Sequence, residues 1–209
     1  MKYFFLNMKK SFRVSAILRN TLPLLTIFFL QTLAQAHPGL PGHTHGFTNG
    51  LAHPLTGLDH ICAMVAAGLW AAQRGGRALW AVPLAFVSVM ALGGMLGMAG
   101  GAFPFVETGI ATSVLILGVL IAASVRLPLL MSVLIVGVFA LFHGFAHGAE
   151  MPATASGLAY GMGFILATAS LHLGGIGLGL AAKQLGSMRL IRYAGGAIAA
   201  CGIYLFIAA

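Results

Sequence analysis

The side chains best suited to chemistry in this 209-residue chain are a few carboxylates and histidines set among apolar residues. All three acidic residues lie in or beside apolar stretches that are long enough to span a bilayer: Asp59, Glu107 and Glu150. His60 follows Asp59 directly, and His147 lies three residues before Glu150. A charged side chain inside a membrane costs roughly 2.5–3.5 kcal/mol on insertion scales, so ionisable groups there commonly mark a functional site. Carboxylates beside imidazoles indicate that this site handles a metal ion or a proton.

The segment from His143 to Glu150 has the more informative spacing. At 3.6 residues per turn, His143 and His147 lie about 40° apart around a helix, and Glu150 returns to within about 20° of His143. Two imidazoles and a carboxylate on one stripe are typical of helix-borne metal sites of the His-x-x-x-His kind. Gly144 and Gly148 leave room for a neighbouring helix. The alternative is three polar groups hydrogen-bonded between helices, each of which would need a partner within the hydrocarbon.

A second group of such residues runs from His53 to His60 and includes Asp59. A continuous helix would place His53 roughly 10 Å from His60 along the axis. Pro54 suits a first helical turn and Gly57 loosens the chain after it, so we expect His53 at an irregular start that folds it toward Asp59 and His60. Imidazole with carboxylate suits nickel, cobalt, zinc or copper, whereas magnesium and calcium prefer oxygen ligands. A protonated His/Asp relay is the main alternative occupant.

Other reactive side chains are isolated. His172 is the one histidine of a long apolar segment, and the two groups above favour a functional role for it over a structural hydrogen bond. Glu107 either joins the site or caps the helix that it begins. Met64, Cys62 and Cys201 are interpreted as packed core residues, with Cys62 as a soft metal ligand the lesser alternative.

The elements that must position these residues are membrane helices. Only 7% of the chain is charged and the mean hydropathy is +0.98, whereas soluble domains have roughly 25% charged residues, so the chain has room for a membrane domain alone. The formal net charge of +8 owes much to five basic residues within the first 20. Beyond them, six basic and three acidic residues leave +3, with no basic stripe for nucleic acid, and nucleic-acid binding is not expected.

Residues 1–36 are predicted to form a cleaved signal peptide. They combine a basic start, an apolar stretch and the cleavage-type triplet Ala34-Gln35-Ala36. An uncleaved first helix is the alternative. Cleavage would make His37 the new N-terminus, where its amine and imidazole can chelate a metal ion together. His43 and His45 follow in the extracytoplasmic segment 37–52, which is interpreted as a His-rich metal-collecting segment or else as a plain solvated linker.

Residues 53–209 are predicted to be an all-α polytopic membrane domain. Gly and Pro breaks divide it into six spans of roughly 20 residues, the length a bilayer demands: 54–73, 78–99, 106–125, 128–148, 155–181 and 190–208. With the mature N-terminus outside, every remaining basic residue faces the cytoplasm, as the positive-inside rule requires: Arg74, Arg77, Arg126, Lys183, Arg189 and Arg192. The carboxylates and all the histidines except His172 then lie near the outer ends of their spans.

These motifs resemble those of the HupE/UreJ family of nickel/cobalt permeases. The resemblance rests on His53-Pro54 through Gly57, Asp59-His60 and Gly68-Leu69-Trp70, and on the run from Phe142 to Glu150. It covers essentially the whole mature chain. It implies secondary transport of Ni²⁺ or Co²⁺ across a bacterial inner membrane by the following metal-handling residues: His53, Asp59, His60, His143, His147, Glu150 and, more weakly, His172.

The predicted function is therefore a permease that imports nickel or cobalt and is not an enzyme. The metal is its transported ion rather than a cofactor. Spans one and four cross in opposite senses, which suggests an inverted three-plus-three repeat with the site at its interface as a hypothesis. One rival function is a membrane-embedded hydrolase that uses His143, His147 and His172 on zinc, with Glu150 as base. Another is a metal-binding accessory or sensor protein. The choice between nickel and cobalt and the formation of a homo-oligomer stay open.

Overall fold

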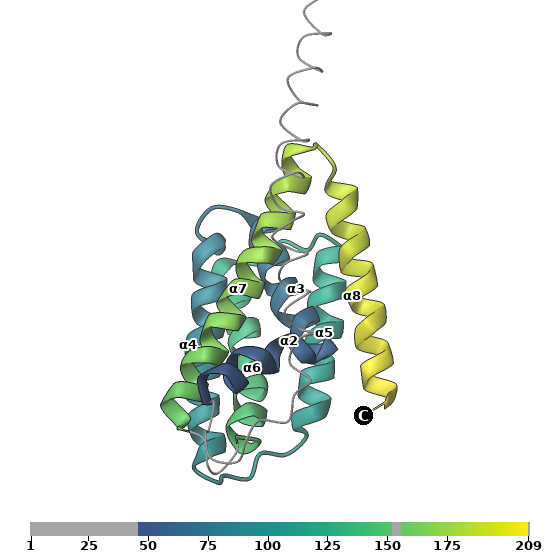
Figure 1. The fold of residues 1–209 in the computed structure, drawn as a ribbon. Helices are drawn as coiled ribbons and strands as arrows, with labels where there is room; N and C mark the ends of the chain where they lie inside the picture. The colour runs from purple at the N-terminus through teal and green to yellow at the C-terminus, as the bar shows by residue number, and fades with distance from the viewer. Residues whose placement is uncertain (1–45, 152–155, 209) are drawn as a thin grey trace, which may run out of the picture. The chain divides into compact units, whose positions relative to one another are not determined.

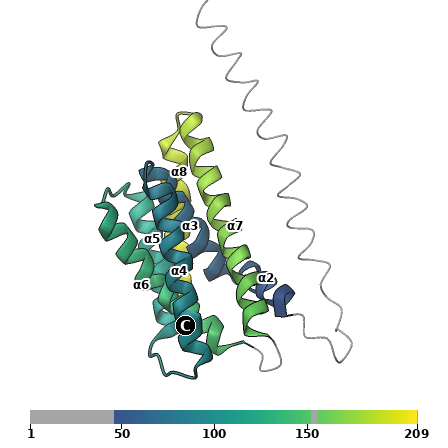
Figure 2. The same cartoon turned by 90° about the vertical axis from the view of Figure 1, so that its left-hand side faces the viewer.

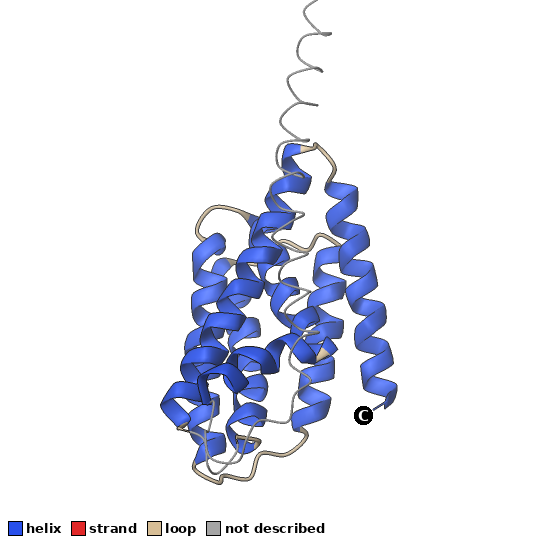
Figure 3. Ribbon diagram, viewed as in Figure 1, coloured by secondary structure: helices blue, strands red, loops and turns tan. Residues whose placement is uncertain are grey.

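The computed structural model describes residues 46–151 and 156–208, and every element within them is a helix (Figure 3). The predicted signal peptide, His37, His43 and His45 lie outside the described residues. The seven helices are α2 (Gly46–Thr56), α3 (Leu58–Arg74), α4 (Ala78–Met98), α5 (Val106–Ala122), α6 (Leu129–Ala149), α7 (Gly157–Gln184) and α8 (Met188–Ala208). The bounds of α4 to α8 agree with the predicted ranges to within three residues, so the Gly and Pro breaks were correctly located.

The start of the first predicted span differs from expectation. In place of an irregular start, residues Gly46–Thr56 form a separate helix that contains Pro54. It meets α3 at an 80° bend across the extended residue Gly57, and its steep angle to the neighbouring helices is visible in Figure 1. A helix this short owes its stability to packing, and α2 packs closely on α7. A Cβ atom added at Gly50 would meet the carbonyl oxygen of Tyr160 at 2.0 Å, so the missing side chain is what permits this approach.

Several helices are suited to crossing a membrane. Helices α4, α6, α7 and α8 are each long and apolar enough, and the bent pair α2 and α3 passes the same test as one broken span. Helix α5 is apolar but has 17 residues, fewer than the roughly 20 that a bilayer requires. The described residues therefore contain four to five candidate spans by this measure, against the six that were predicted. The helices fit a multi-pass membrane protein.

Helix α3 lies at the centre of the bundle, packed against α4, α5, α7 and α8 (Figures 1 and 2). Most of its residues from Ala63 onward are buried, as expected for the segment from Ala63 to Ala72, which is apolar all round. The other close pairs are α4 with α6 and α5 with α8. Glycine brings the α4–α6 pair together, because a Cβ atom at Gly144 or Gly148 would meet a backbone oxygen of α4 at 2.0 Å.

The two ends of the bundle carry different polar residues. His53, His60 and His147 belong to one end, at the last turns of α2 and α6 and the first turn of α3. Arg74 and Lys183 lie in the last turns of α3 and α7, at the opposite end. This separation leaves the carboxylates and most of the histidines at one end of the helices and the basic residues at the other.

Candidate metal centre

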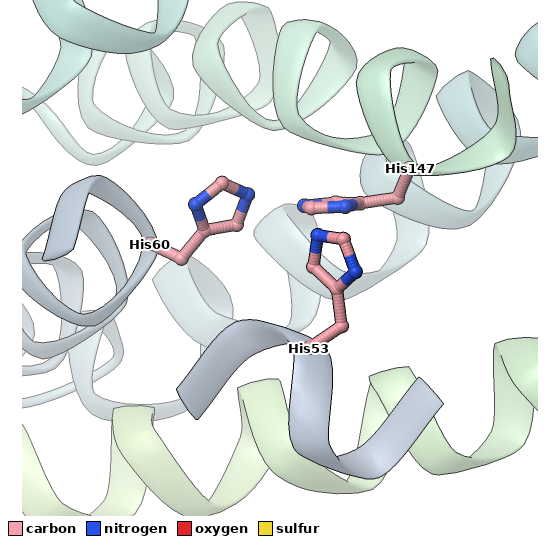
Figure 4. A group of neighbouring side chains, drawn as sticks. All are labelled: His53, His60 and His147. Atoms are coloured by element: carbon pink, nitrogen blue, oxygen red, sulfur yellow. The ribbon is translucent and has the colours of Figure 1, made fainter. Parts of the chain in front are cut away.

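Three imidazoles converge from three helices. His53 of α2, His60 of α3 and His147 of α6 each offer a ring nitrogen, and these nitrogens lie within 4.8 Å of one another (Figure 4). The ring centroids of His53 and His60 lie 4.6 Å and 4.3 Å from that of His147. The bend at Gly57 makes this possible, because it turns α2 back toward α6. A continuous helix would hold His53 and His60 about 10 Å apart along its axis.

The spacing of the three nitrogens suits a transition-metal ion after a small contraction. Nitrogen ligands lie about 2.0–2.1 Å from a zinc-sized ion, so two of them on one ion are at most about 4.2 Å apart. Binding would therefore draw the nitrogen atoms together by roughly half an ångström.

Asp59 fixes the ring of His60. Its Oδ1 lies 2.6 Å from Nδ1 of His60, and this leaves Nε2 of the same ring available to a metal ion. Gly57 is packed against both groups, because a Cβ atom there would lie 2.6 Å from the carboxylate oxygen and 2.8 Å from Nδ1. A carboxylate that orients a metal-binding imidazole and raises its basicity is a common second layer of metal sites.

Glu150 marks the open side of the group. Its Oε2 lies 3.6 Å from Nε2 of His53, at the C-terminal end of α6. The side chains become progressively less exposed from Glu150 at 55% through His53 at 34% to His60 at 9%. His147 and His143 are buried. The group thus leads from solvent into the bundle.

His143 lies one turn deeper on α6 and is oriented by a serine. Oγ of Ser113 lies 2.6 Å from the carbonyl oxygen of Ile110 and 2.9 Å from Nε2 of His143. The serine has one hydrogen, and when it donates that hydrogen to the carbonyl, Nε2 of His143 is the donor in the second contact. Nδ1 of His143 then carries the free lone pair that a cation requires. The ring lies 5.2 Å from that of His60.

The ring of Phe86 contacts both His143 of α6 and His172 of α7. The centroid of Phe86 is 5.8 Å from the ring of His143 and 4.9 Å from that of His172. A second aromatic ring, that of Phe164, lies 4.1 Å from His147 and forms the α7 side of the group. These three histidine–phenylalanine contacts place the imidazoles in apolar surroundings.

The buried ring nitrogens of this region lack partners within the described chain: both nitrogens of His147 and His172, Nε2 of His60 and Nδ1 of His143. An unpaired buried polar atom costs about 1–3 kcal/mol, so six of them together would be a heavy structural burden. A cation that binds between the rings would satisfy several at once. This lack of partners, more than the number of histidines, makes the group a candidate binding site.

The remaining predicted residues lie elsewhere. Glu107 is exposed in the first turn of α5, outside the histidine group. Met64 is buried in the core, as interpreted from the sequence. Sequence reasoning missed Ser113, Phe86 and Phe164. A polar residue within an apolar helix was a detectable signal for Ser113, whereas phenylalanine is too common in membrane helices to indicate a site.

Taken together, the helices and the buried imidazoles define a polytopic membrane protein with a candidate metal centre between its helices. Residues 25–205 match the family model described as HupE / UreJ protein, and the chain belongs to this family. It is 47% identical over 185 residues to Protein HupE of Rhizobium leguminosarum bv. viciae, an alignment that covers 88% of this chain and 95% of that protein. No solved structure matches the chain.

Proposed function

We propose that this protein is a secondary transporter that imports Ni²⁺ or Co²⁺ across the inner membrane of a bacterium. The observation that carries the proposal is the convergence of His53, His60 and His147, whose nitrogens approach to within 4.8 Å while the ring nitrogens of His147 have no other partner among the described residues. Imidazole nitrogens suit nickel and cobalt, and resemblance to the HupE/UreJ permeases implies transport of these ions.

The ion enters beside Glu150 and His53, where the side chains are most exposed. The three-histidine group replaces part of its water shell, and Asp59 compensates part of its charge through the ring of His60. His143 then receives the ion through Nδ1. The ring of Phe86 separates this position from His172, so we infer that Phe86 must move before the ion passes inward. Before these steps, His37 with His43 and His45 would collect the ion outside.

Such a site must release its ion as well as bind it. Closed structural sites bind zinc with apparent free energies of about 10–16 kcal/mol, which would prevent turnover. Three imidazoles, one of them half-buried and movable with α2, form a more open arrangement. Neutral ligands with carboxylates in the second layer are consistent with moderate affinity.

Orientation and energy supply follow from charge. We infer that α3 to α8 form six spans and that the end bearing the basic residues faces the cytoplasm, in accordance with the positive-inside rule. Inward movement of two positive charges then gains about 4.6 kcal/mol per 100 mV of membrane potential. This electrical free energy alone can drive accumulation of the ion inside the cell.

The packing also supports an inverted repeat in which α3, α4 and α5 correspond to α6, α7 and α8. If the two halves are exchanged, the α3–α7 pair becomes the α6–α4 pair and the α5–α8 pair maps onto itself, and all three of these pairs are in close contact. The contacts of α3 with α4 and α5 have no equivalent of similar extent between α6 and α7 or α8, so the correspondence of the halves is partial. Helix α2 has no counterpart among the described residues of the second half. In such a repeat, rocking of one half against the other opens the site to alternate sides. An experimental structure without a pseudo-two-fold axis in the membrane plane would exclude this arrangement.

Two rival functions make different demands. A zinc hydrolase built on His143, His147 and His172 would need those three rings around one ion. Among the described residues, however, the group with nitrogens close enough comprises His53, His60 and His147. A sensor or accessory protein would use the same three-histidine group without moving the ion. Transport measurements separate this last function from a permease.

The test is uptake of nickel and cobalt, each in competition with the other, by a transport-deficient bacterium that expresses wild type, His147→Ala or Ser170→Ala. Ser170 is exposed on α7 and donates within its own helix to Leu166, so its variant controls for expression and insertion. Uptake by wild type and Ser170→Ala that collapses in His147→Ala supports a permease, and the competition identifies the ion. Absence of uptake with all three proteins in the membrane would reject it.

A further inference from the structure

A pocket of about 340 Å³ opens at the end of the bundle opposite the histidines. It lies where the end of α3, the loop between α5 and α6, and the turn between α7 and α8 meet. Its lining is Gln73, Arg74, Arg126, Lys183 and Met188. Three of these five residues are basic, and the pocket plays no part in the metal path proposed above.

The basic residues of this pocket have no acidic side chain to neutralise them. The whole chain contains three acidic residues, and each belongs to the other end: Asp59 in the first turn of α3, Glu107 in the first turn of α5 and Glu150 after the end of α6. Three cations around one pocket repel one another unless an anion lies between them. Any anion that binds between them must therefore come from outside the chain.

Arg74 lacks partners at its buried atoms. Its Nε and Nη1 are inaccessible to solvent and have no hydrogen-bond acceptor among the described residues. The guanidinium lies 6.0 Å from the ring of Trp70, which helps to hold its position. Gln73 beside it is fixed as well, because its Nε2 donates to the carbonyl oxygen of Ile121 and to Oγ of Ser124. A guanidinium held in place with unsatisfied donors suits the oxygen atoms of a phosphate group.

The surroundings of the pocket favour a lipid as the source of that phosphate. Apolar side chains on the neighbouring turn are exposed, with Leu185 at 47% and Leu190 at 50%. Leu130, which follows Arg126 at the start of α6, is 68% exposed. Acyl chains can pack on these side chains while the headgroup occupies the pocket. Basic pockets between helices at the cytoplasmic membrane surface bind anionic headgroups by this means.

We propose that Arg74, Arg126 and Lys183 form a binding site for the phosphate of an anionic phospholipid. The lipid joins α3 to α7 and to the hairpin of α5 and α6, so it connects elements that are far apart in the sequence. The phosphate balances part of the positive charge of these three side chains, for which the chain itself supplies no acidic side chain nearby. Binding depends on the pocket and does not require the transport function.

The test uses the full chain, purified and incorporated into phosphatidylcholine discs that contain a minor fraction of phosphatidylglycerol. Native mass spectrometry then measures the phosphatidylglycerol that remains bound after gentle detergent extraction. Arg74→Gln and the double variant Arg126→Gln/Lys183→Gln remove pocket charges. Arg77→Gln/Arg189→Gln removes two exposed charges from the same end that do not line the pocket. Thermal unfolding of each protein shows whether it is folded.

Retention should fall roughly fivefold for each pocket charge removed and stay near wild type in the control. Equal losses in the pocket and control variants would overturn the proposal, because they would indicate a diffuse positive surface. A second arm titrates inorganic phosphate. If phosphate alone binds with the same dependence on Arg74 and no lipid is retained, the pocket is a free-anion site and the lipid assignment is wrong. Failure of every variant to change retention would also overturn it.

Discussion

At the scale of single residues, we infer that Ser113 selects the nitrogen of His143 that is free for a cation. Its hydroxyl donates to Ile110 and accepts from Nε2 of His143, so Nδ1 keeps its lone pair. Ser113→Ala should weaken nickel binding by about 10-fold or more, in the range found when second-layer partners of metal ligands are removed. Isothermal titration of nickel into the purified protein measures this.

Ser132→Ala is the matched control for that prediction. Ser132 is also buried and donates to a nearby backbone carbonyl, that of Pro128 at the N-cap of α6, but it lies at the opposite end of α6 from His147. It should bind nickel as wild type does. If both variants bind equally well, Ser113 does not orient the ligand and the assignment of Nδ1 is wrong.

Gly57 is a second residue with a defined steric role. A methyl group there would lie 2.6 Å from Oδ1 of Asp59 and 2.8 Å from Nδ1 of His60, so Gly57→Ala must displace one of them. We expect weaker nickel binding with little loss of fold, since the clash involves side chains at the end of a helix. Gly161→Ala is the control, because a methyl group at that position meets no atom within 4 Å. Unchanged affinity in Gly57→Ala would mean that the pair formed by Asp59 and His60 does not support the site.

Sequence reasoning located more of the fold than of the site. The helix ends at Gly75, Gly100 and Gly186 were predictable because glycine takes a positive φ there, as the structure finds. The spacing of His143 and His147 placed both on one face of a helix. The approach of His53 to His147 was not predictable, because it depends on an 80° bend and on contact between segments about 90 residues apart. The role of Pro54 was also misjudged, since packing on α7 maintains a helix around it.

At the scale of elements, the contact between α3 and α8 tests the proposed rocking of the two halves. Sγ of Cys62 and Sγ of Cys201 lie 3.6 Å apart, close enough to form a disulfide after a small movement. Oxidation by copper–phenanthroline and dioxygen removes two electrons and two protons from the thiols and joins the helices. If the halves must separate during transport, uptake should fall strongly and recover after reduction with dithiothreitol.

Cys201→Ala is the control for the cross-link. It should transport as wild type does and should not respond to the oxidant. Full transport by protein that is shown by mass spectrometry to be cross-linked would mean that α3 and α8 keep their contact throughout the cycle. The proposed division into moving halves would then be wrong, although the metal centre would be unaffected.

At the scale of the whole molecule, the two ends of the bundle carry different ionisable residues. Histidines and carboxylates lie at one end of the helices and the basic residues at the other, with His172 buried deeper on α7. A protein that only binds the metal needs only the end that carries the histidines and carboxylates. The continuation from His147 through His143 to His172 would be superfluous for a sensor, and it is the feature that favours passage of the ion through the bundle.

The most direct measurement of that passage uses sealed vesicles containing purified protein. Nickel or cobalt is added outside, a membrane potential negative inside is imposed, and metal in the lumen is followed with a trapped fluorescent indicator. Wild type and Ser170→Ala should accumulate the ion at a rate that rises with the potential, and His147→Ala should not exceed protein-free vesicles. Binding of metal by wild type without any accumulation in the lumen would contradict transport and leave a metal-binding membrane protein.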